Sequence, residues 1–167
     1  MTEKRKTDSP PADPLQKTKD KAMALLALRP LSEAELRKKL TEKGFEADNI
    51  EQVIALCLDY GFVDDEQYAA MLARQYRAKG YGPRRLRAEL TRRGVAREII
   101  DRTALPADED GDTLDRLVAA RLRGRDCGDP KQLKKTADAL LRRGWSWTEV
   151  REAIARYEPD AEIGESE

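Results

Sequence analysis

The sequence repeats with a period of 50 residues, and this feature limits its fold more than any other. A glycine, a leucine and a β-branched residue each occur three times at that interval. A period of about 20–50 residues is typical of arrays of small structural modules. We therefore predict three copies of one helical unit between residues 17 and 157. The repeated positions are Gly44, Gly94 and Gly144; Leu40, Leu90 and Leu140; and Ile50, Ile100 and Val150.

Each repeated glycine is predicted to end a helix. Helices often stop at a residue in the left-handed conformation, which glycine adopts freely and which costs other residues roughly 1–2 kcal/mol. In the Schellman form of this ending, the residue after the glycine packs against the residue four positions before the glycine. All three units supply an apolar pair there, so we assign the glycines a structural role. The pairs are Phe45 and Leu40, Val95 and Leu90, and Trp145 and Leu140.

Helix-start signals at matching places indicate three helices in each unit. A Ser or Asp followed three residues later by Glu can form a capping box, and proline suits the first helical position. Asp64 or Asp65 can cap the first helix of the second unit. The other expected starts are Ser32–Glu35, Asp48–Glu51, Gly82–Pro83, Asp129–Pro130 and Ser146–Glu149.

Composition favours an all-α chain, because 19 leucines stand against only 11 valines and isoleucines together. Stacking the units predicts an elongated, curved, solenoid-like array roughly 75 Å long. We find neither a signal peptide nor the roughly 20 apolar residues of a membrane span, and expect a cytoplasmic protein. The expected divisions are a disordered arm over 1–16, repeats over 17–63, 64–105 and 114–157, an acidic linker over 106–113, and an acidic tail over 158–167.

The residue types exclude the common catalytic centres. With no histidine, the chain cannot form a Ser-His or Cys-His pair or a His-ligated metal site. Cys57 falls on an apolar helix face and is predicted to be an inert core thiol, while Cys127 lies in a loop and receives no function. The acidic cluster Asp64–Glu66 is interpreted as helix capping. We therefore expect no enzyme activity, no catalytic residues, no cofactor and no metal.

Charge is distributed unevenly although its sum is zero. Residues 74–103 hold ten basic and three acidic residues, and residues 116–157 hold eleven and five, with an acidic segment between them. Basic blocks of this size favour contact with an anionic surface. Repeat-equivalent arginines, such as Arg92 with Arg142 and Arg93 with Arg143, are expected to form a row. The candidate nucleic-acid or filament-binding residues are Arg84, Arg85, Arg87, Arg92, Arg93, Lys131, Lys134, Lys135, Arg142 and Arg143.

Aromatic residues in the same regions could add stacking on nucleic-acid bases. The candidates are Tyr76, Tyr81, Trp145 and Trp147. Because Trp145 is already assigned to the helix-end contact, Trp147 is the better stacking candidate. Packing between units is the competing interpretation for Trp147.

Three stretches resemble the RecX family of bacterial regulatory proteins. The most specific is Gly61-Phe62-Val63-Asp64-Asp65 followed by Tyr68-Ala69. The other two are Ala24–Phe45, with Arg29 before Ser32, and Gly80–Gly94, with Gly82 and Leu86 inside it. The similarity extends over residues 17 to about 157, with the third unit matching least well.

The resemblance implies three tandem three-helix repeats without catalytic activity. It further implies binding to the RecA recombinase, alone or as its nucleoprotein filament, and limitation of strand exchange, ATP hydrolysis and co-protease action. Such proteins act in DNA repair, recombination and the SOS response and can contact DNA. We expect a monomer that makes no contact with membranes.

Two other functions fit the residues. One is a stand-alone DNA-binding protein of helix-turn-helix-like repeats, related to tandem Myb repeats. Those carry tryptophans in every unit, whereas Trp145 and Trp147 both lie in the third. The other is a helical adaptor for an acidic protein partner, which would lose its partner but not DNA on Arg92→Glu plus Arg142→Glu.

Replacement of Gly94 tests the helix-end assignment. Gly94→Val should lower the free energy of unfolding by about 1–2 kcal/mol or more, because it forces a Cβ into a left-handed position. Thermal melting followed by circular dichroism measures the change, and an unchanged melting temperature would contradict the assignment.

Overall fold

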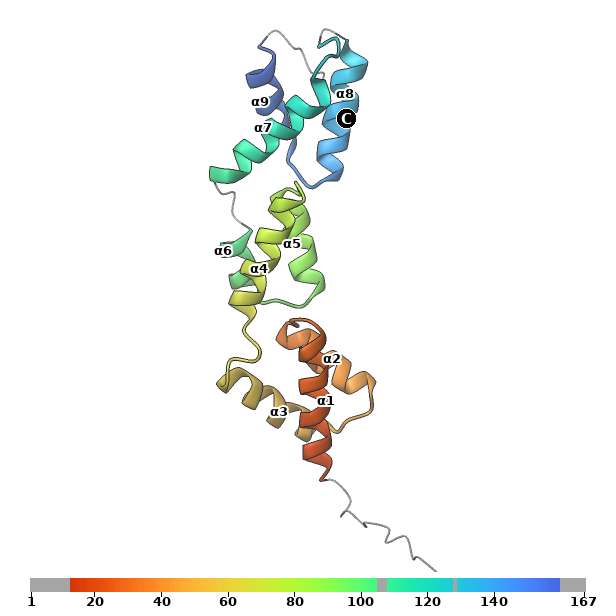
Figure 1. Cartoon of the computed structure of the whole chain (residues 1–167), viewed down its shortest axis with the longest axis vertical. Helices are drawn as coiled ribbons and strands as arrows, with labels where there is room; N and C mark the ends of the chain where they lie inside the picture. Colours follow the sequence, from red (N-terminus) through yellow and green to blue (C-terminus); the bar gives the residue numbers. More distant parts are fainter. Residues whose placement is uncertain (1–12, 105–107, 128, 160–167) are drawn as a thin grey trace, which may run out of the picture. The chain divides into compact units, whose positions relative to one another are not determined.

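In the computed structural model, residues 13–104, 108–127 and 129–159 are described, and every regular element in these ranges is an α-helix (Figure 1). The prediction of an all-α fold is therefore confirmed. The helices are α1 (Pro14–Leu28), α2 (Glu33–Glu42), α3 (Ala47–Asp59), α4 (Asp65–Ala78), α5 (Pro83–Arg92), α6 (Arg97–Thr103), α7 (Asp108–Leu122), α8 (Pro130–Arg142) and α9 (Trp147–Tyr157).

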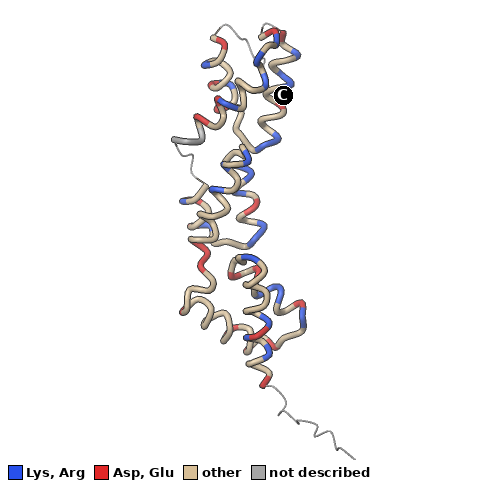
Figure 2. The backbone as a smooth tube through the Cα atoms, viewed as in Figure 1, with Lys and Arg blue, Asp and Glu red and all other residues tan. Residues whose placement is uncertain are grey.

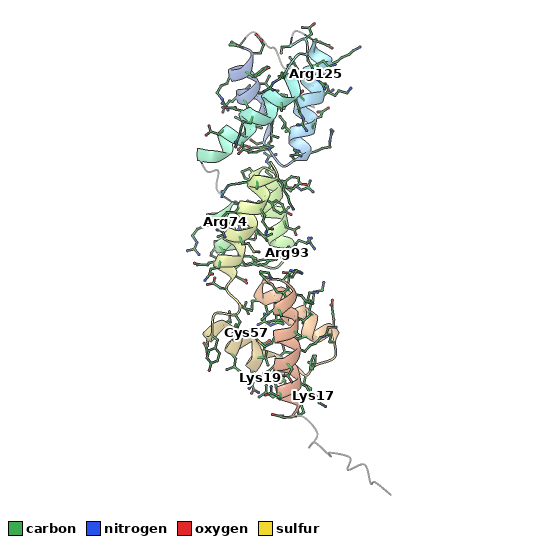
Figure 3. The ribbon with its side chains drawn as sticks, viewed as in Figure 1. Lys17, Lys19, Cys57, Arg74, Arg93 and Arg125 are labelled. Atoms are coloured by element: carbon green, nitrogen blue, oxygen red, sulfur yellow. The ribbon has the colours of Figure 1, made fainter. Side chains whose placement is uncertain are left out.

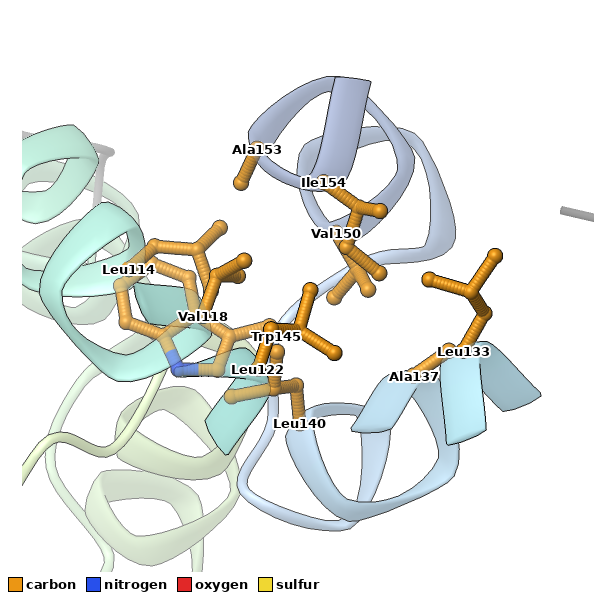
Figure 4. Close-up of a cluster of buried hydrophobic side chains, with 10 residues drawn as sticks. All are labelled: Leu114, Val118, Leu122, Leu133, Ala137, Leu140, Trp145, Val150, Ala153 and Ile154. Atoms are coloured by element: carbon orange, nitrogen blue, oxygen red, sulfur yellow. The ribbon is translucent and has the colours of Figure 1, made fainter. Parts of the chain in front are cut away.

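These helices form two compact units, divided between Asp65 and Glu66. The first unit contains α1–α3, which we name repeat 1. The second contains α4–α6 and α7–α9, which we name repeat 2 and repeat 3. Each repeat buries its own cluster of apolar side chains, and the cluster of repeat 3 is drawn in Figure 4.

The 50-residue period of the sequence corresponds to these three cores. Leu40, Leu90 and Leu140 are completely buried, one in each repeat. Ile50, Ile100 and Val150 are buried beside them. The three cores are therefore built from equivalent positions of the repeat. This holds even for the polar Thr136, which is buried at the position that Leu36 and Leu86 occupy in the other two repeats.

The repeated glycines end α2, α5 and α8 as predicted. Gly44, Gly94 and Gly144 have φ angles of 81°, 71° and 93°, all in the left-handed region. Each following residue donates its N–H to the carbonyl of the repeated leucine, as Trp145 does to Leu140 at 3.3 Å. Phe45, Val95 and Trp145 each pack with the apolar cluster that contains that leucine.

Most of the expected helix starts are confirmed. Ser32 and Ser146 form complete capping boxes at α2 and α9, and Pro83 and Pro130 are the first residues of α5 and α8. The expected box over Asp48–Glu51 is wrong, because α3 begins at Ala47 and Asp48 already lies in its first turn.

Asp65 caps a different helix from the one expected. It is the first residue of α4, and its carboxylate accepts the backbone N–H of Glu33 at 2.9 Å, at the beginning of α2. Partial burial, as the main cause, raises the pKa of this carboxyl group. Asp64 directly precedes α4.

Some of the expected segment boundaries fall inside helices. Residues 14–16, assigned to the arm, belong to α1, and residues 108–113, assigned to the acidic linker, belong to α7. An acid-rich segment suits the beginning of a helix because of the positive end of the helix dipole. Residues 1–12, 105–107, 128 and 160–167 lie outside the described residues, including most of the arm and of the acidic tail.

Two glycine substitutions should separate backbone strain from steric contact. An alanine Cβ at Gly44 would meet open space, whereas one at Gly144 would lie 2.5 Å from the Cβ of Arg85. Gly44→Ala should cost about 1–2 kcal/mol from its left-handed φ alone, and Gly144→Ala about 1–3 kcal/mol more from the added contact. Urea denaturation of both variants measures the difference, and equal losses would contradict the close approach at Gly144.

Candidate nucleic-acid interface

Repeats 2 and 3 are joined by backbone hydrogen bonds between the start of α5 and the end of α8. The Gly82 N–H donates to the Arg143 carbonyl at 2.9 Å, and the Arg84 N–H donates to the Gly144 carbonyl at 3.1 Å. A Cβ on Gly82 would lie 2.5 Å from the Gly144 oxygen, so only glycine permits this approach. As a result, the basic residues that begin α5 lie beside those that end α8 (Figure 2).

Side chains of repeat 3 reinforce this junction. The Arg143 Nη1 donates to the Lys79 carbonyl at 2.9 Å and contacts the Gly80 carbonyl at 3.4 Å. The Trp145 Nε1 donates to the same Gly80 carbonyl at 3.3 Å, and Trp145 is only 2% exposed. Trp145 is thus a core and junction residue, which agrees with its assignment to the helix end.

Tyr81 holds two guanidinium groups at the junction. The guanidinium carbons of Arg85 and Arg143 lie 4.2 and 5.5 Å from the centre of its ring. Both distances are within the roughly 6 Å range of a cation–π interaction. The ring of Tyr76 also lies 5.3 Å from that of Tyr81, so these two stacking candidates contact one another, and Tyr81 contacts the arginines.

Two arginines outside the predicted set extend this positive charge away from the junction: Arg121, near Arg142 and Arg143, and Arg125, beside the first turn of α8. The pKa of Arg121 is lowered mainly by burial and also by the positive charges of Arg143, Arg125 and Arg142. Arg125 lies after α7, and its Nη1 donates to the Gln132 side chain at 3.1 Å. The signal that could have found them is their place at and just after the end of α7, inside the basic segment 116–157 that also contains the candidates of α8.

Three of the predicted residues follow one side of α8. Lys131, Lys135 and Arg142 are exposed and spaced by four and seven residues, which places them on one stripe of the helix. Leu133 and Leu140 are buried on the opposite face. Lys134 is also exposed on this helix. The stripe ends at the junction, where Arg142 closes α8.

The predicted arginines of α5 divide into two groups. Arg84 and Arg85, at its beginning, lie at the junction. Arg92 and Arg93, at its end, each place a guanidinium nitrogen 2.6 Å from the Glu89 carboxylate. Arg87 is ion-paired with Asp101.

The junction therefore does not bring the repeat-equivalent arginines together in the expected row. Arg142 and Arg143 lie beside the start of α5, whereas Arg92 and Arg93 lie about 13 Å along the helix, at its other end. Arg93, labelled in Figure 3, also donates to the Tyr68 hydroxyl at 2.6 Å, inside repeat 2. A neighbouring repeat meets the beginning of α5 because Gly82 and Gly144 allow the backbones to touch there.

Two further depressions lie outside this junction. One, of about 690 Å³, is lined by both signs of charge, including Arg74, Arg116, Asp112 and Asp115. The other is an apolar groove of about 270 Å³ in repeat 1, where Tyr60 and Phe62 are 73% and 54% exposed. Cys57 is among the residues that line this groove and is itself buried, as predicted, and this burial raises the pKa of its thiol.

The described part of the chain contains no group of three or more Cys, Asp or Glu side chains arranged to hold a metal ion. Across the same residues, no helix combines the length and apolar character needed to span a membrane.

Two segments match known three-helix domains. Residues 19–57 match the first three-helix domain of RecX, and residues 64–103 match the second. The regulatory protein RecX of Vibrio vulnificus is 34% identical over 143 residues, which cover 85% of this chain and 94% of that protein. The chain belongs to the RecX family. Regulatory protein RecX of Escherichia coli K12 is also 34% identical, over 80% of this chain and 87% of its own length.

Solved RecX structures share the fold. The crystal structure of RecX from Lactobacillus salivarius superposes with a TM-score of 0.78, covering 89% of this chain and 99% of that one at 21% identity. A second RecX crystal structure gives a TM-score of 0.72 over 87% of this chain. The two RecX domain matches lie within repeats 1 and 2, and repeat 3 extends the family's three-helix pattern.

Glu89 should make stability depend on pH. Its pKa is lowered from 4.5 to about 2, first by the hydrogen bond from Arg92 and then by that from Arg93, while partial burial opposes the shift. A lowered pKa in the folded state stabilises the fold above the unfolded-state pKa, and this contribution is lost as the pH falls from about 4.5 to 2.

Glu89→Gln should therefore lower the free energy of unfolding by about 2 kcal/mol at pH 7 and by much less at pH 2.5. Urea denaturation of both proteins at the two pH values measures this. An equal difference at both would contradict the ion-pair explanation.

Proposed function

We propose that this chain is a non-enzymatic regulator of the RecA recombinase. It binds RecA, alone and in its nucleoprotein filament, and mainly inhibits recombination, ATP hydrolysis and co-protease activity during DNA repair and the SOS response. It acts as a monomer in the cytoplasm, with DNA as a secondary contact. The supporting observation is the 34% identity to proteins named regulatory protein RecX over 94% of the length of one of them.

The described surfaces support a regulator that has both a protein and a nucleic-acid contact. Arginines of repeats 2 and 3 gather at their junction, which suits an anionic polymer. The apolar groove of repeat 1 exposes Tyr60 and Phe62, and exposed apolar surfaces of this kind are typical of protein contacts. A nucleoprotein filament presents both kinds of partner at once.

The stand-alone DNA-binding protein remains the second candidate, because the junction arginines would serve it equally well. It predicts DNA affinity that falls steeply with salt and needs no recombinase. The exposed aromatic groove favours the regulator, since a protein that binds only phosphates does not require it.

A recombinase ATPase assay on single-stranded DNA tests the proposal. Adding this chain at amounts stoichiometric with RecA should lower the rate of ATP hydrolysis, because a regulator bound along the filament opposes its active form. A heat-denatured sample of the chain and an assay at saturating DNA are the controls. No inhibition, or inhibition abolished by added DNA alone, would contradict regulation and favour the DNA-binding candidate.

A further inference from the structure

Five arginines without a carboxylate partner in the described part of the chain extend from the junction of repeats 2 and 3 along α8 to Arg125, which lies beside the first turn of that helix. We name Arg85, Arg121, Arg125, Arg142 and Arg143 the junction arginines. Within the described residues, none of the five is ion-paired, whereas Arg37, Arg87, Arg92, Arg93, Arg102 and Arg156 all are. Like charges held together oppose folding unless an anion offsets them.

Three of the junction arginines, Arg85, Arg125 and Arg143, are held in place by neutral groups, which leave their charge uncancelled. Arg143 donates to the carbonyls of Lys79 and Gly80, and Arg125 donates to Gln132. Arg85 lies over the Tyr81 ring. Guanidinium groups fixed in this way lose little further freedom on binding, and their planar forks match phosphate oxygens.

The cluster is longer than a single phosphate needs. Arg125 bonds to Gln132, in the first turn of α8, and Arg142 ends that helix ten residues later, which corresponds to about 15 Å. Arg121 lies within electrostatic range of both. A mononucleotide or free phosphate would leave part of this length unoccupied, whereas several consecutive nucleotides would fill it.

We infer that the junction arginines bind consecutive phosphates of a single-stranded nucleic acid, which thereby bridges repeats 2 and 3. The inference rests on the proposed function for the presence of such a strand, and it specifies which surface faces it. Arg85 comes from repeat 2 and the other four come from repeat 3. A strand bound to both repeats stabilises their junction, because any ligand that prefers the joined state shifts the equilibrium toward it.

Paired substitutions test the inference. Arg121→Gln plus Arg142→Gln removes two junction charges, and Lys38→Gln plus Arg102→Gln removes two charges elsewhere, from residues paired with Glu42 and Glu66. Affinity for a fluorescent 30-nucleotide oligo-dT is measured by anisotropy from 50 to 300 mM salt. The junction pair should lower the slope of log affinity against log salt by about 1.4, or about 0.7 for each lost phosphate contact. An equal loss in the control pair would overturn the inference.

Melting temperatures show whether the variants lose a site or lose their fold. Without an anion, Arg121→Gln should melt no lower than the unsubstituted chain, because it removes like-charge repulsion. Oligo-dT should raise the melting temperature of the unsubstituted chain more than that of Arg121→Gln. A lower melting temperature of Arg121→Gln, or an equal response to oligo-dT, would overturn the inference.

Two further measurements identify the ligand and separate this inference from the proposed function. Inorganic pyrophosphate should compete only at concentrations far above those of oligo-dT phosphate; equal potency would overturn a nucleic-acid site. In the ATPase assay, absence of inhibition by the unsubstituted chain contradicts RecA regulation, yet a slope that depends on the junction arginines still supports the phosphate site. Full inhibition by the unsubstituted chain, with the same salt slope in the Arg121→Gln plus Arg142→Gln variant, would support RecA regulation and overturn the phosphate site.

Discussion

The close approach of two backbones at Gly144 is the constraint on which repeats 2 and 3 depend. Its left-handed φ of 93° ends α8, and its missing side chain leaves room for Arg85. Gly82 meets it from the other repeat, so that main-chain hydrogen bonds join the two. One residue type therefore serves two purposes at the same place. The glycine that terminates a helix inside repeat 3 also creates the surface on which the preceding repeat docks.

Much of the fold was predictable because its determinants are local. Capping boxes at Ser32 and Ser146 and left-handed glycines each act within a few residues, and the 50-residue period exposes them three times. The structure departs from the local patterns in two places. The acidic linker expected over 106–113 overlaps the beginning of α7, and Asp65, one of the two residues expected to cap α4, accepts a hydrogen bond from the beginning of α2. Tertiary contacts decide both cases.

The candidate site was less predictable, because charge alone does not show which arginines are neutralised. Arg92 and Arg93 share a repeat period with Arg142 and Arg143, yet Glu89 has no acidic counterpart in repeat 3, where Ala139 stands. Guanidinium groups at equivalent positions are thus ion-paired with Glu89 in repeat 2 and have no carboxylate partner among the described residues of repeat 3. Arg121 and Arg125 were missed because their relevance comes from the packing of α7 against α8, which brings Arg121 near Arg142 and Arg143 and Arg125 beside Gln132. Repeat symmetry predicts the core well, since equivalent positions face equivalent neighbours, and predicts the surface poorly.

The position of Trp145 has a spectroscopic consequence. The indole is enclosed in the core of repeat 3 while its nitrogen donates to a carbonyl of repeat 2. The only other tryptophan, Trp147, lies two residues away and packs against the same core. Tryptophan fluorescence of this chain, excited selectively over tyrosine, therefore arises entirely from repeat 3. A shift in its emission wavelength is a label-free report on the joint between the second and third repeats, with no signal from the first.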